Sequence, residues 1–214
     1  EWGVPSRIIT DFESNSLDLA KHLVAVHAAG FTTCVIGHRL PVVARGSRAR
    51  SLEVDRRQFS RLLEMFPPED KRCYEADFLP DVPPFHSGMS IVFTSGTSGP
   101  GKPVVHTVEN HYASATAVND YFDLGPEHAW LAALPFCHVG GQCVLWRCLL
   151  AGARLDVVEH GEDFCSALQK LRSTHLSLVP TQLRKLVSSE TDHMPEAIMV
   201  GGAATPRAPG EGPG

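Results

Sequence analysis

Residues 91–107 read IVFTSGTSGPGKPVVHT, and this stretch decides how the rest of the chain is interpreted. A largely β-branched run at 91–94 leads into a loop of Ser, Thr, Gly and Pro, and a second β-branched run follows at 104–107. Both runs favour strands, because β-branched side chains pack well on a pleated surface. The stretch therefore predicts two strands joined by a glycine-rich loop.

The loop comes close to the P-loop of NTPases. Gly96 to Lys102 fits the pattern G-x-x-x-x-G-K. A P-loop then needs Ser or Thr to bind Mg²⁺, and a helix whose amino end faces the phosphates. Pro103 stands where that hydroxyl should be, and the run after it favours a strand. The sequence therefore disfavours a P-loop NTPase.

Composition alone leaves two alternatives for this loop, a phosphate-binding loop or an ordinary Gly/Ser connection. Hydroxyl and amide N–H groups suit phosphate oxygens, and a lysine adds a positive charge. Glycines let the backbone approach a ligand closely, but they are also common in plain turns. The groups available to phosphate are Thr94, Ser95, Gly96, Thr97, Ser98, Gly99 and Lys102.

The composition excludes several classes of protein. The 214 residues carry 19 basic and 24 acidic side chains, a net charge of -5, and no basic field marks a nucleic-acid surface. There is no 18-residue apolar run for a membrane span, and residues 1–16 lack the pattern of a signal peptide. The six cysteines and eleven histidines lack metal-site spacing, so no metal ligands are assigned. Free thiols in a reducing compartment, and a cytoplasmic location, are expected.

Strand and helix patterns alternate along the chain. Strands are predicted at 31–37, 89–94, 104–107, 129–135, 153–158, 175–180 and 196–202, and helices at 14–30, 55–66, 108–122, 139–152, 162–173 and 181–189. This order predicts an α/β fold with mostly parallel sheets flanked by helices. Ligands of such sheets bind beyond the carboxyl ends of the strands. The loops expected there are 95–103, 135–141, 180–182 and 201–204.

Four stretches in one order resemble the adenylate-forming superfamily of acyl-CoA synthetases, luciferases and peptide-synthetase adenylation domains. The superfamily's phosphate loop reads Thr-Ser-Gly-Thr-Thr-Gly-x-Pro-Lys-Gly, and residues 94–103 read TSGTSGPGKP. LPFCHVGG at 134–141, SLVPTQLRKL at 177–186 and MVGGAATP at 199–206 follow in the superfamily's order. An early Asn-Ser helix at 15–30 also fits. The departures are Ser98 for Thr, the exchanged order of Pro100 and Gly101, and Pro103 for Gly.

Within this superfamily, residues 106–159 look most like o-succinylbenzoate–CoA ligases of menaquinone biosynthesis. The similarity is carried by the Asn110–His111 pair and by the Trp-Leu-Ala strand at 130–132. The resemblance implies two half-reactions. A carboxylate attacks the α-phosphate of Mg²⁺-ATP to give acyl-AMP and pyrophosphate, and the thiol of coenzyme A (CoA) then displaces AMP.

The resemblance also implies a role for each matching residue. Lys102 and His138 are the candidate catalytic residues, with the loop at 94–102 on the β and γ phosphates and His138 beside the carboxylate. The nucleotide would further contact Thr181, Gly201, Gly202 and Ala203. The implied partners are ATP, Mg²⁺, CoA and a small-molecule carboxylate.

Structural alternatives to these roles stay open from the sequence. His138 could be a core histidine with satisfied hydrogen bonds, and Gly201–Gly202 could be a plain turn. Trp146, Cys143 and Cys148 lie at helical spacing, which predicts core packing rather than a site.

The resemblance implies that residues 1–206 are part of an AMP-binding N-terminal domain, and that 207–214 are a disordered tail or a boundary artefact. The superfamily's adenine-stacking loop, its Mg²⁺-binding Glu and its C-terminal domain with a catalytic Lys do not occur in these 214 residues. The chain begins with Glu1 rather than Met, so we expect a piece of a longer protein that is inactive alone. The alternatives are an adenylation domain that loads a carrier protein, or a degenerate, non-catalytic nucleotide-binding protein. Homo-oligomerisation stays open.

Overall fold

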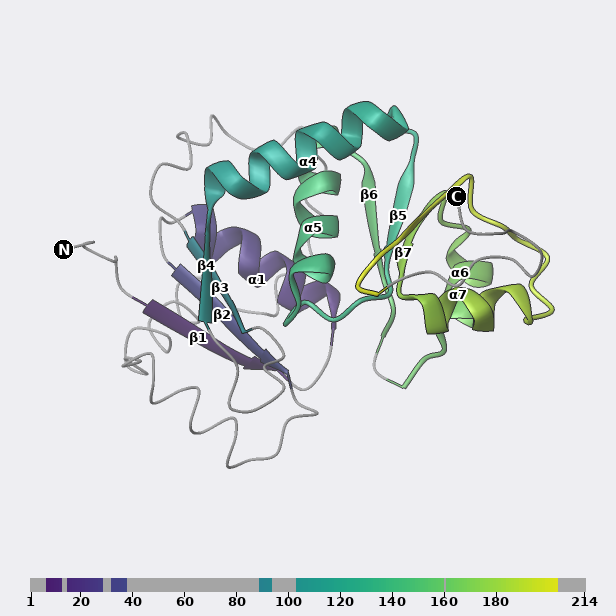
Figure 1. The fold of residues 1–214 in the computed structure, drawn as a ribbon, viewed down its shortest axis with the longest axis horizontal. Helices are drawn as coiled ribbons and strands as arrows, with labels where there is room; N and C mark the ends of the chain where they lie inside the picture. Colours follow the sequence, from purple (N-terminus) through teal and green to yellow (C-terminus); the bar gives the residue numbers. More distant parts are fainter. Residues whose placement is uncertain are drawn as a thin grey trace, which may run out of the picture.

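Two four-stranded sheets organise the structure, a computed structural model (Figure 1). It describes residues 7–12, 15–28, 32–37, 89–93, 103–159 and 161–203. The first sheet has the order β1-β2-β3-β4 and contains β1 (Arg7–Phe12), β2 (Thr32–Gly37), β3 (Met89–Phe93) and β4 (Pro103–Thr107). The second has the order β6-β5-β7-β8 and contains β5 (Ala129–Ala132), β6 (Arg154–Val157), β7 (His175–Leu178) and β8 (Ala197–Val200). The helices are α1 (Leu17–Ala28), α4 (Val108–Phe122), α5 (Val139–Ala151), α6 (Phe164–Leu171) and α7 (Pro180–Val187).

The first sheet confirms the interpretation of the stretch at 91–107. β3 pairs antiparallel with β4, and Phe93 lies opposite Pro103. The two ends of the connecting loop are therefore neighbours, and a strand rather than a helix follows Lys102. That arrangement excludes the P-loop geometry, which needs a helix at this point. The loop itself, residues 94–102, lies outside the described residues.

β1 was not predicted from the sequence. It pairs in parallel with β2, from Arg7 opposite Thr32 to Phe12 opposite Gly37. Its sequence, RIITDF, has two adjacent apolar residues followed by polar ones. It therefore lacks the alternation of apolar and polar residues that predicts a strand.

The second sheet is entirely parallel, and helices cover both of its faces. Trp130 and Ala132 of β5 pack with α1 and α5, whereas Leu131 packs with α6 and α7 on the opposite face. α1 and α5 lie between the two sheets (Figure 1). The predicted fold class, mostly parallel sheets flanked by helices, is therefore confirmed.

Most predicted elements form with shifted ends. The strand predicted at 129–135 ends at Ala132, and the one predicted at 175–180 ends at Leu178. Pro180 instead begins α7, because a proline suits the first turn of a helix, where its missing N–H has no partner to lose. The predicted helix at 55–66 lies outside the described residues. Among the residues that can be described, no helix is long and apolar enough to cross a membrane.

Local hydrogen bonds explain where the first helices begin. The hydroxyl of Ser16 accepts the N–H of Leu19 at 3.1 Å and so caps α1. At α4, Thr107 and Asn110 form a reciprocal capping box. Both caps satisfy amide groups that the helix cannot satisfy itself.

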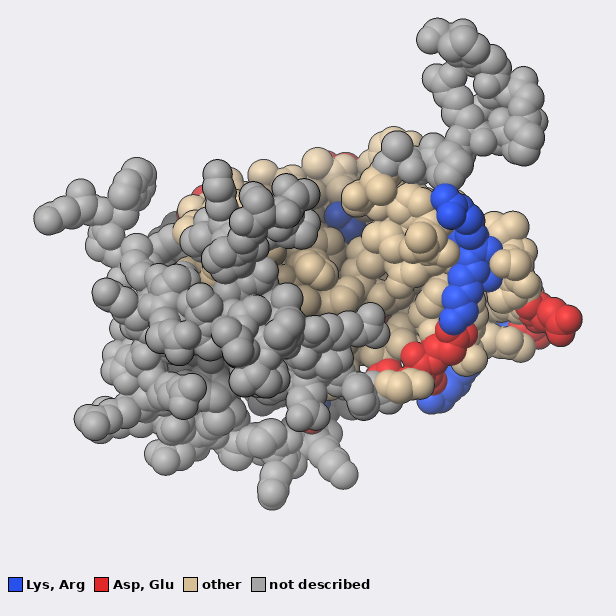
Figure 2. All heavy atoms as spheres, turned by 60° about the horizontal axis from the view of Figure 1, so that its bottom comes forward, with Lys and Arg blue, Asp and Glu red and all other residues tan. Residues whose placement is uncertain are grey.

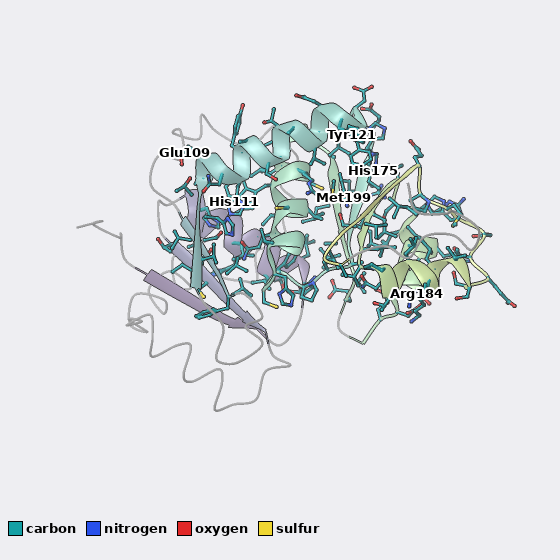
Figure 3. The ribbon with its side chains drawn as sticks, viewed as in Figure 1. Glu109, His111, Tyr121, His175, Arg184 and Met199 are labelled. Atoms are coloured by element: carbon teal, nitrogen blue, oxygen red, sulfur yellow. The ribbon has the colours of Figure 1, made fainter. Side chains whose placement is uncertain are left out.

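A buried polar cluster joins the first sheet to the helices. His111 projects from α4 and is labelled in Figure 3. Its Nε2 lies 2.7 Å from the hydroxyl of Ser90 on β3, and its ring stacks on Trp146 of α5. Thr33 on β2 lies 3.2 Å from Nε2 of His27 on α1, and that ring meets Trp146 edge-on. Burial, with smaller contributions from His27 and His106, lowers the pKa of His111 to about 4. This cluster holds a neutral imidazole in the core at neutral pH.

Candidate functional site

The carboxyl edge of the second sheet gathers the predicted site residues that can be described. β5, β7 and β8 are parallel neighbours, so the segments after them leave at the same edge. His138 follows β5, Thr181 follows β7, and Gly201 to Ala203 follow β8, and all of them are exposed. The N–H of Gly201 donates to the carbonyl of Leu178 at 3.1 Å, which ties the ends of β7 and β8 together.

The predicted phosphate loop belongs to the other sheet, where it connects β3 to β4. Its candidate residues lie outside the described residues: Thr94, Ser95, Gly96, Thr97, Ser98, Gly99 and Lys102. Their contact with phosphate stays a prediction. The sequence predicted that all four loops follow the carboxyl ends of strands, and the structure divides those strands between two sheets.

His138 is not a core histidine. It is the exposed N-cap residue of α5, with an extended backbone at φ -114° and ψ 147°. Its side chain makes no capping hydrogen bond to the helix. The imidazole therefore remains accessible at the sheet edge. By contrast, Trp146 and Cys148 are buried in the core, as their spacing predicted.

The turn before His138 packs tightly against the first turn of α5. A Cβ added at Gly141 would lie 2.3 Å from the carbonyl oxygen of Pro135 and 2.7 Å from that of Leu134. Real Cβ atoms do not approach backbone so closely, so this position requires glycine. The second glycine of the LPFCHVGG stretch thus allows the first turn of α5 to pack directly on the backbone of the preceding turn. This contact fixes the position at which α5 starts relative to β5.

The glycines after β8 differ from each other. Gly202 has φ +84°, a left-handed conformation that disfavours side chains. A Cβ at Gly201 would meet nothing within 4 Å. Gly201 therefore lies in exposed backbone at the carboxyl edge, with open space where a side chain would be. Turn geometry accounts for Gly202 but not for Gly201.

Arg147 of α5 is the site residue that the sequence analysis missed. Its side chain is only 6 % exposed and projects onto the face of the second sheet. One terminal nitrogen lies 3.5 Å from the hydroxyl of Ser177, which also accepts the indole N–H of Trp130 at 3.1 Å. The guanidinium carbon lies 4.9 Å from the centre of the Trp130 ring. Ser177 is one residue from the carboxyl end of β7, so Arg147 approaches the predicted ligand edge from inside.

The charge of Arg147 is not balanced within the described structure. No Asp or Glu there forms an ion pair with it, and its buried Nε has no hydrogen-bond partner. Burial lowers the pKa of the guanidinium, but arginine keeps its proton at neutral pH. A buried charge without a counter-charge is costly, and arginine is the residue that best binds carboxylates through paired hydrogen bonds. This environment suits a carboxylate ligand.

A sequence signal for Arg147 existed. The helix VGGQCVLWRCLLA contains a single charged residue among apolar neighbours. However, a lone arginine on such a helix can also point to solvent. Only the folded structure shows that Arg147 faces the second sheet.

The charged surface is a separate feature. Figure 2 shows a band of basic side chains bordered by acidic ones. Lys170 pairs with Glu162 at 3.5 Å, Lys185 with Asp163, and Arg172 with Asp192 at 3.8 Å. Exposed pairs of this kind contribute little to stability.

Comparison with known proteins identifies similar sequences. The family model described as AMP-binding enzyme matches residues 20–211. A 2-succinylbenzoate–CoA ligase from Salmonella typhimurium is 42% identical over 119 residues, which cover 55% of this chain and 25% of that protein. The ligase of the same name from Haemophilus influenzae is 37% identical over 141 residues, covering 62% of this chain and 29% of that protein. The matches thus span only a quarter to a third of these relatives.

Solved structures share the fold. Escherichia coli MenE with a bound analogue of OSB-AMS superposes with a TM-score of 0.71 at 26% identity, covering 95% of this chain and 46% of that one. MenE from Bacillus subtilis, in complex with ATP and magnesium, gives a TM-score of 0.69 at 19% identity, covering 94% and 46%. The chain therefore corresponds to less than half of each solved protein.

Proposed function

This chain belongs to the AMP-binding enzyme family, and from that membership we propose that its parent protein is an ATP-dependent acid–thiol ligase. The proposed reaction joins one carboxylate of an aromatic acid to CoA through an acyl-AMP intermediate. The proposed substrate is 2-succinylbenzoate, which would place the protein in menaquinone biosynthesis. The similarity to 2-succinylbenzoate–CoA ligases supports this choice.

The proposed chemistry has two steps. A carboxylate oxygen of the substrate forms a bond to the α-phosphorus of Mg²⁺-ATP, and the bond to pyrophosphate breaks. The sulfur of CoA then bonds to the acyl carbon, and AMP leaves with the electron pair of the C–O bond. Neither step needs a covalent bond to the protein, so the protein contributes positioning and charge stabilisation.

Each candidate residue has a proposed part in these steps. Lys102 and the neighbouring hydroxyls bind the β and γ phosphates and stabilise the departing pyrophosphate. His138, exposed at the start of α5, orients the reacting carboxylate. The open backbone at Gly201 to Ala203 contacts the nucleotide, with Thr181 as a further polar contact.

The single observation that carries the substrate proposal is the buried, unbalanced charge of Arg147. 2-Succinylbenzoate has two carboxylates, and only one of them reacts. The other can pair with the guanidinium and accept from its unpartnered Nε, with Ser177 and Trp130 beside it. A monocarboxylate would leave that charge unbalanced, so the site favours an aryl dicarboxylate.

The rest of the proposal follows from the family. Residues 1–206 are proposed to be part of the large N-terminal domain, and 207–214 to be a tail or a boundary artefact. The 214-residue chain alone does not catalyse adenylation at a useful rate. The parent protein works in the cytoplasm, where ATP and CoA are available.

The test is thioester formation by the complete protein with ATP and CoA. The substrates compared are 2-succinylbenzoate, benzoate, and the analogue of 2-succinylbenzoate without the ring carboxylate. We expect kcat/KM to be at least about 30-fold higher for the dicarboxylate, since a desolvated charge pair contributes about 2 kcal/mol or more. Equal rates for all three would refute the role of Arg147. Transfer to a carrier protein instead of CoA would identify an adenylation domain, and no adenylation at all would identify a non-catalytic protein.

A further inference from the structure

The turn between β5 and His138 is held by a side chain from a distant part of the chain. Asn15, just before α1, donates from Nδ2 to the carbonyl of Leu134 at 2.8 Å. Its Oδ1 accepts the N–H of Phe136, also at 2.8 Å. These partners lie 119 and 121 positions further along the sequence. Asn15 thus makes two hydrogen bonds across one bend of the backbone.

Two other side-chain amides complete this arrangement. Nε2 of Gln142, which is only 2 % exposed, donates to the carbonyl of Phe136 at 2.9 Å. Nε2 of Gln182 on α7 donates to the carbonyl of Ala133 at 3.3 Å. The N–H of His138 donates to the carbonyl of Pro135 at 3.0 Å. Four successive carbonyls, 133 to 136, therefore each accept a hydrogen bond, three of them from a side-chain amide.

Packing also restricts the turn on both of its sides. Phe136 is fully buried in the core between the sheets. On the other side, Gly141 brings the first turn of α5 against the carbonyls of Leu134 and Pro135. The direction in which the backbone leaves toward His138 is thus set by Asn15 on one side and α5 on the other.

We propose that Asn15 is a positioning residue for the carboxylate site. It fixes the turn that presents His138 at the carboxyl edge of the second sheet, and it acts through the backbone of Leu134 and Phe136 rather than through contact with a ligand. Only the expected effect on carboxylate binding rests on the proposed function; the effect on the turn does not. A side-chain amide is needed because one partner is an acceptor and the other a donor.

The experiment compares Asn15→Leu with Ser16→Ala in the complete protein. Leucine has the same number of side-chain heavy atoms and makes neither hydrogen bond. Ser16→Ala is the matched control, because it removes the neighbouring cap of α1 and leaves the turn intact. Three quantities are measured: deuterium exchange of the Phe136 amide, and the KM values for carboxylate and for ATP in thioester formation. Asn15→Asp is the second variant in case Asn15→Leu does not fold, since it keeps the acceptor for Phe136 and loses the donor to Leu134.

In Asn15→Leu we expect the Phe136 amide to exchange about tenfold faster, as for loss of a buried hydrogen bond. The carboxylate KM rises about tenfold, while the ATP KM changes less than about twofold. Ser16→Ala leaves all three near wild type, and Asn15→Asp raises the carboxylate KM as Asn15→Leu does, because a carboxylate oxygen then faces the carbonyl oxygen of Leu134. Equal exchange in Asn15→Leu and Ser16→Ala, or equal rises of both KM values, would overturn the inference. Exchange needs no catalysis, so it decides the inference even if the complete protein forms no thioester and the proposed function fails.

Discussion

The guanidinium of Arg147 lies over the indole ring of Trp130, 4.9 Å from its centre, in the layer between α5 and the second sheet. The indole N–H and the guanidinium both contact the hydroxyl of Ser177. The ring and the hydroxyl offset part of the cost of burying a charge, but Nε has no hydrogen-bond partner among the described residues. The fold therefore keeps an arginine where an apolar residue would pack at lower cost. Sites that bind ligands commonly carry such a cost.

Replacing Arg147 separates stability from function. In Arg147→Met, we expect the free energy of unfolding to be unchanged or raised by about 1 kcal/mol or more, because the desolvated charge is removed. The kcat/KM for 2-succinylbenzoate should fall at least about 30-fold, which corresponds to about 2 kcal/mol. Urea unfolding and steady-state kinetics of the complete protein measure the two effects.

Arg172→Met is the matched control, because Arg172 is exposed and makes only a long ion pair with Asp192. It should leave kcat/KM within about twofold. If Arg147→Met instead unfolds the protein while Arg172→Met does not, Arg147 is structural and the ligand role is wrong.

Gly141 should tolerate no side chain. A Cβ there would lie 2.3 Å from a backbone oxygen, so Gly141→Ala forces α5 away from the turn and should destabilise the protein by about 1 to 3 kcal/mol. Gly140→Ala is the neighbouring control. Its Cβ would meet only the end of the Leu134 side chain at 3.1 Å, and alanine favours the helix by about 1 kcal/mol. Thermal and urea unfolding measure the stability of both variants. Equal stabilities of Gly141→Ala and Gly140→Ala would contradict the packing of α5 against the turn.

The buried imidazole of His111 predicts loss of stability in acid. Its pKa is about 4 in the folded protein, below the value of about 6.5 expected in the unfolded chain. As pH falls from about 6.5 to about 4, the unfolded chain binds a proton that the folded protein does not. Stability is therefore complete above pH 6.5 and falls by about 3 kcal/mol across this window. Burial also lowers the pKa of His22 and His175, so both act in the same direction.

His111→Gln should flatten this dependence. Between pH 7 and pH 4.5, the free energy of unfolding of this variant should fall less than that of the wild type. The comparison concerns this change with pH and not the stability of the variant at pH 7. Tyr112→Phe, on the exposed face of the same helix, should retain the wild-type slope. Parallel curves for His111→Gln and the wild type would show that His111 does not titrate as described.

Local patterns were enough to predict most of the fold. The strand–helix alternation from 89 onward, and the strand that follows Lys102 in place of a helix, are properties of neighbouring residues. The rule that ligands bind at the carboxyl ends of parallel strands placed His138 and Gly201 at one edge. Pro180 was misassigned to a strand because proline also begins helices.

Features that depend on residues far apart in the sequence could not be predicted. Nothing near β3 shows that it joins β2 and β4 rather than β5. The burial of Arg147 depends on Trp130 and Ser177, which lie on two different strands. The contact of Asn15 with the turn before His138 spans about half of the chain. Such contacts arise only when the layers assemble.

The complete protein is proposed to activate an aryl dicarboxylate as its adenylate. Exchange of labelled pyrophosphate into ATP by that protein, in the absence of CoA, tests this proposal most directly. The account predicts exchange that requires 2-succinylbenzoate and that falls at least about tenfold in Lys102→Ala, since removing one preorganised charge at a developing anion costs this much or more. Exchange that is absent with every carboxylate, or that is unaffected by Lys102→Ala, would contradict it.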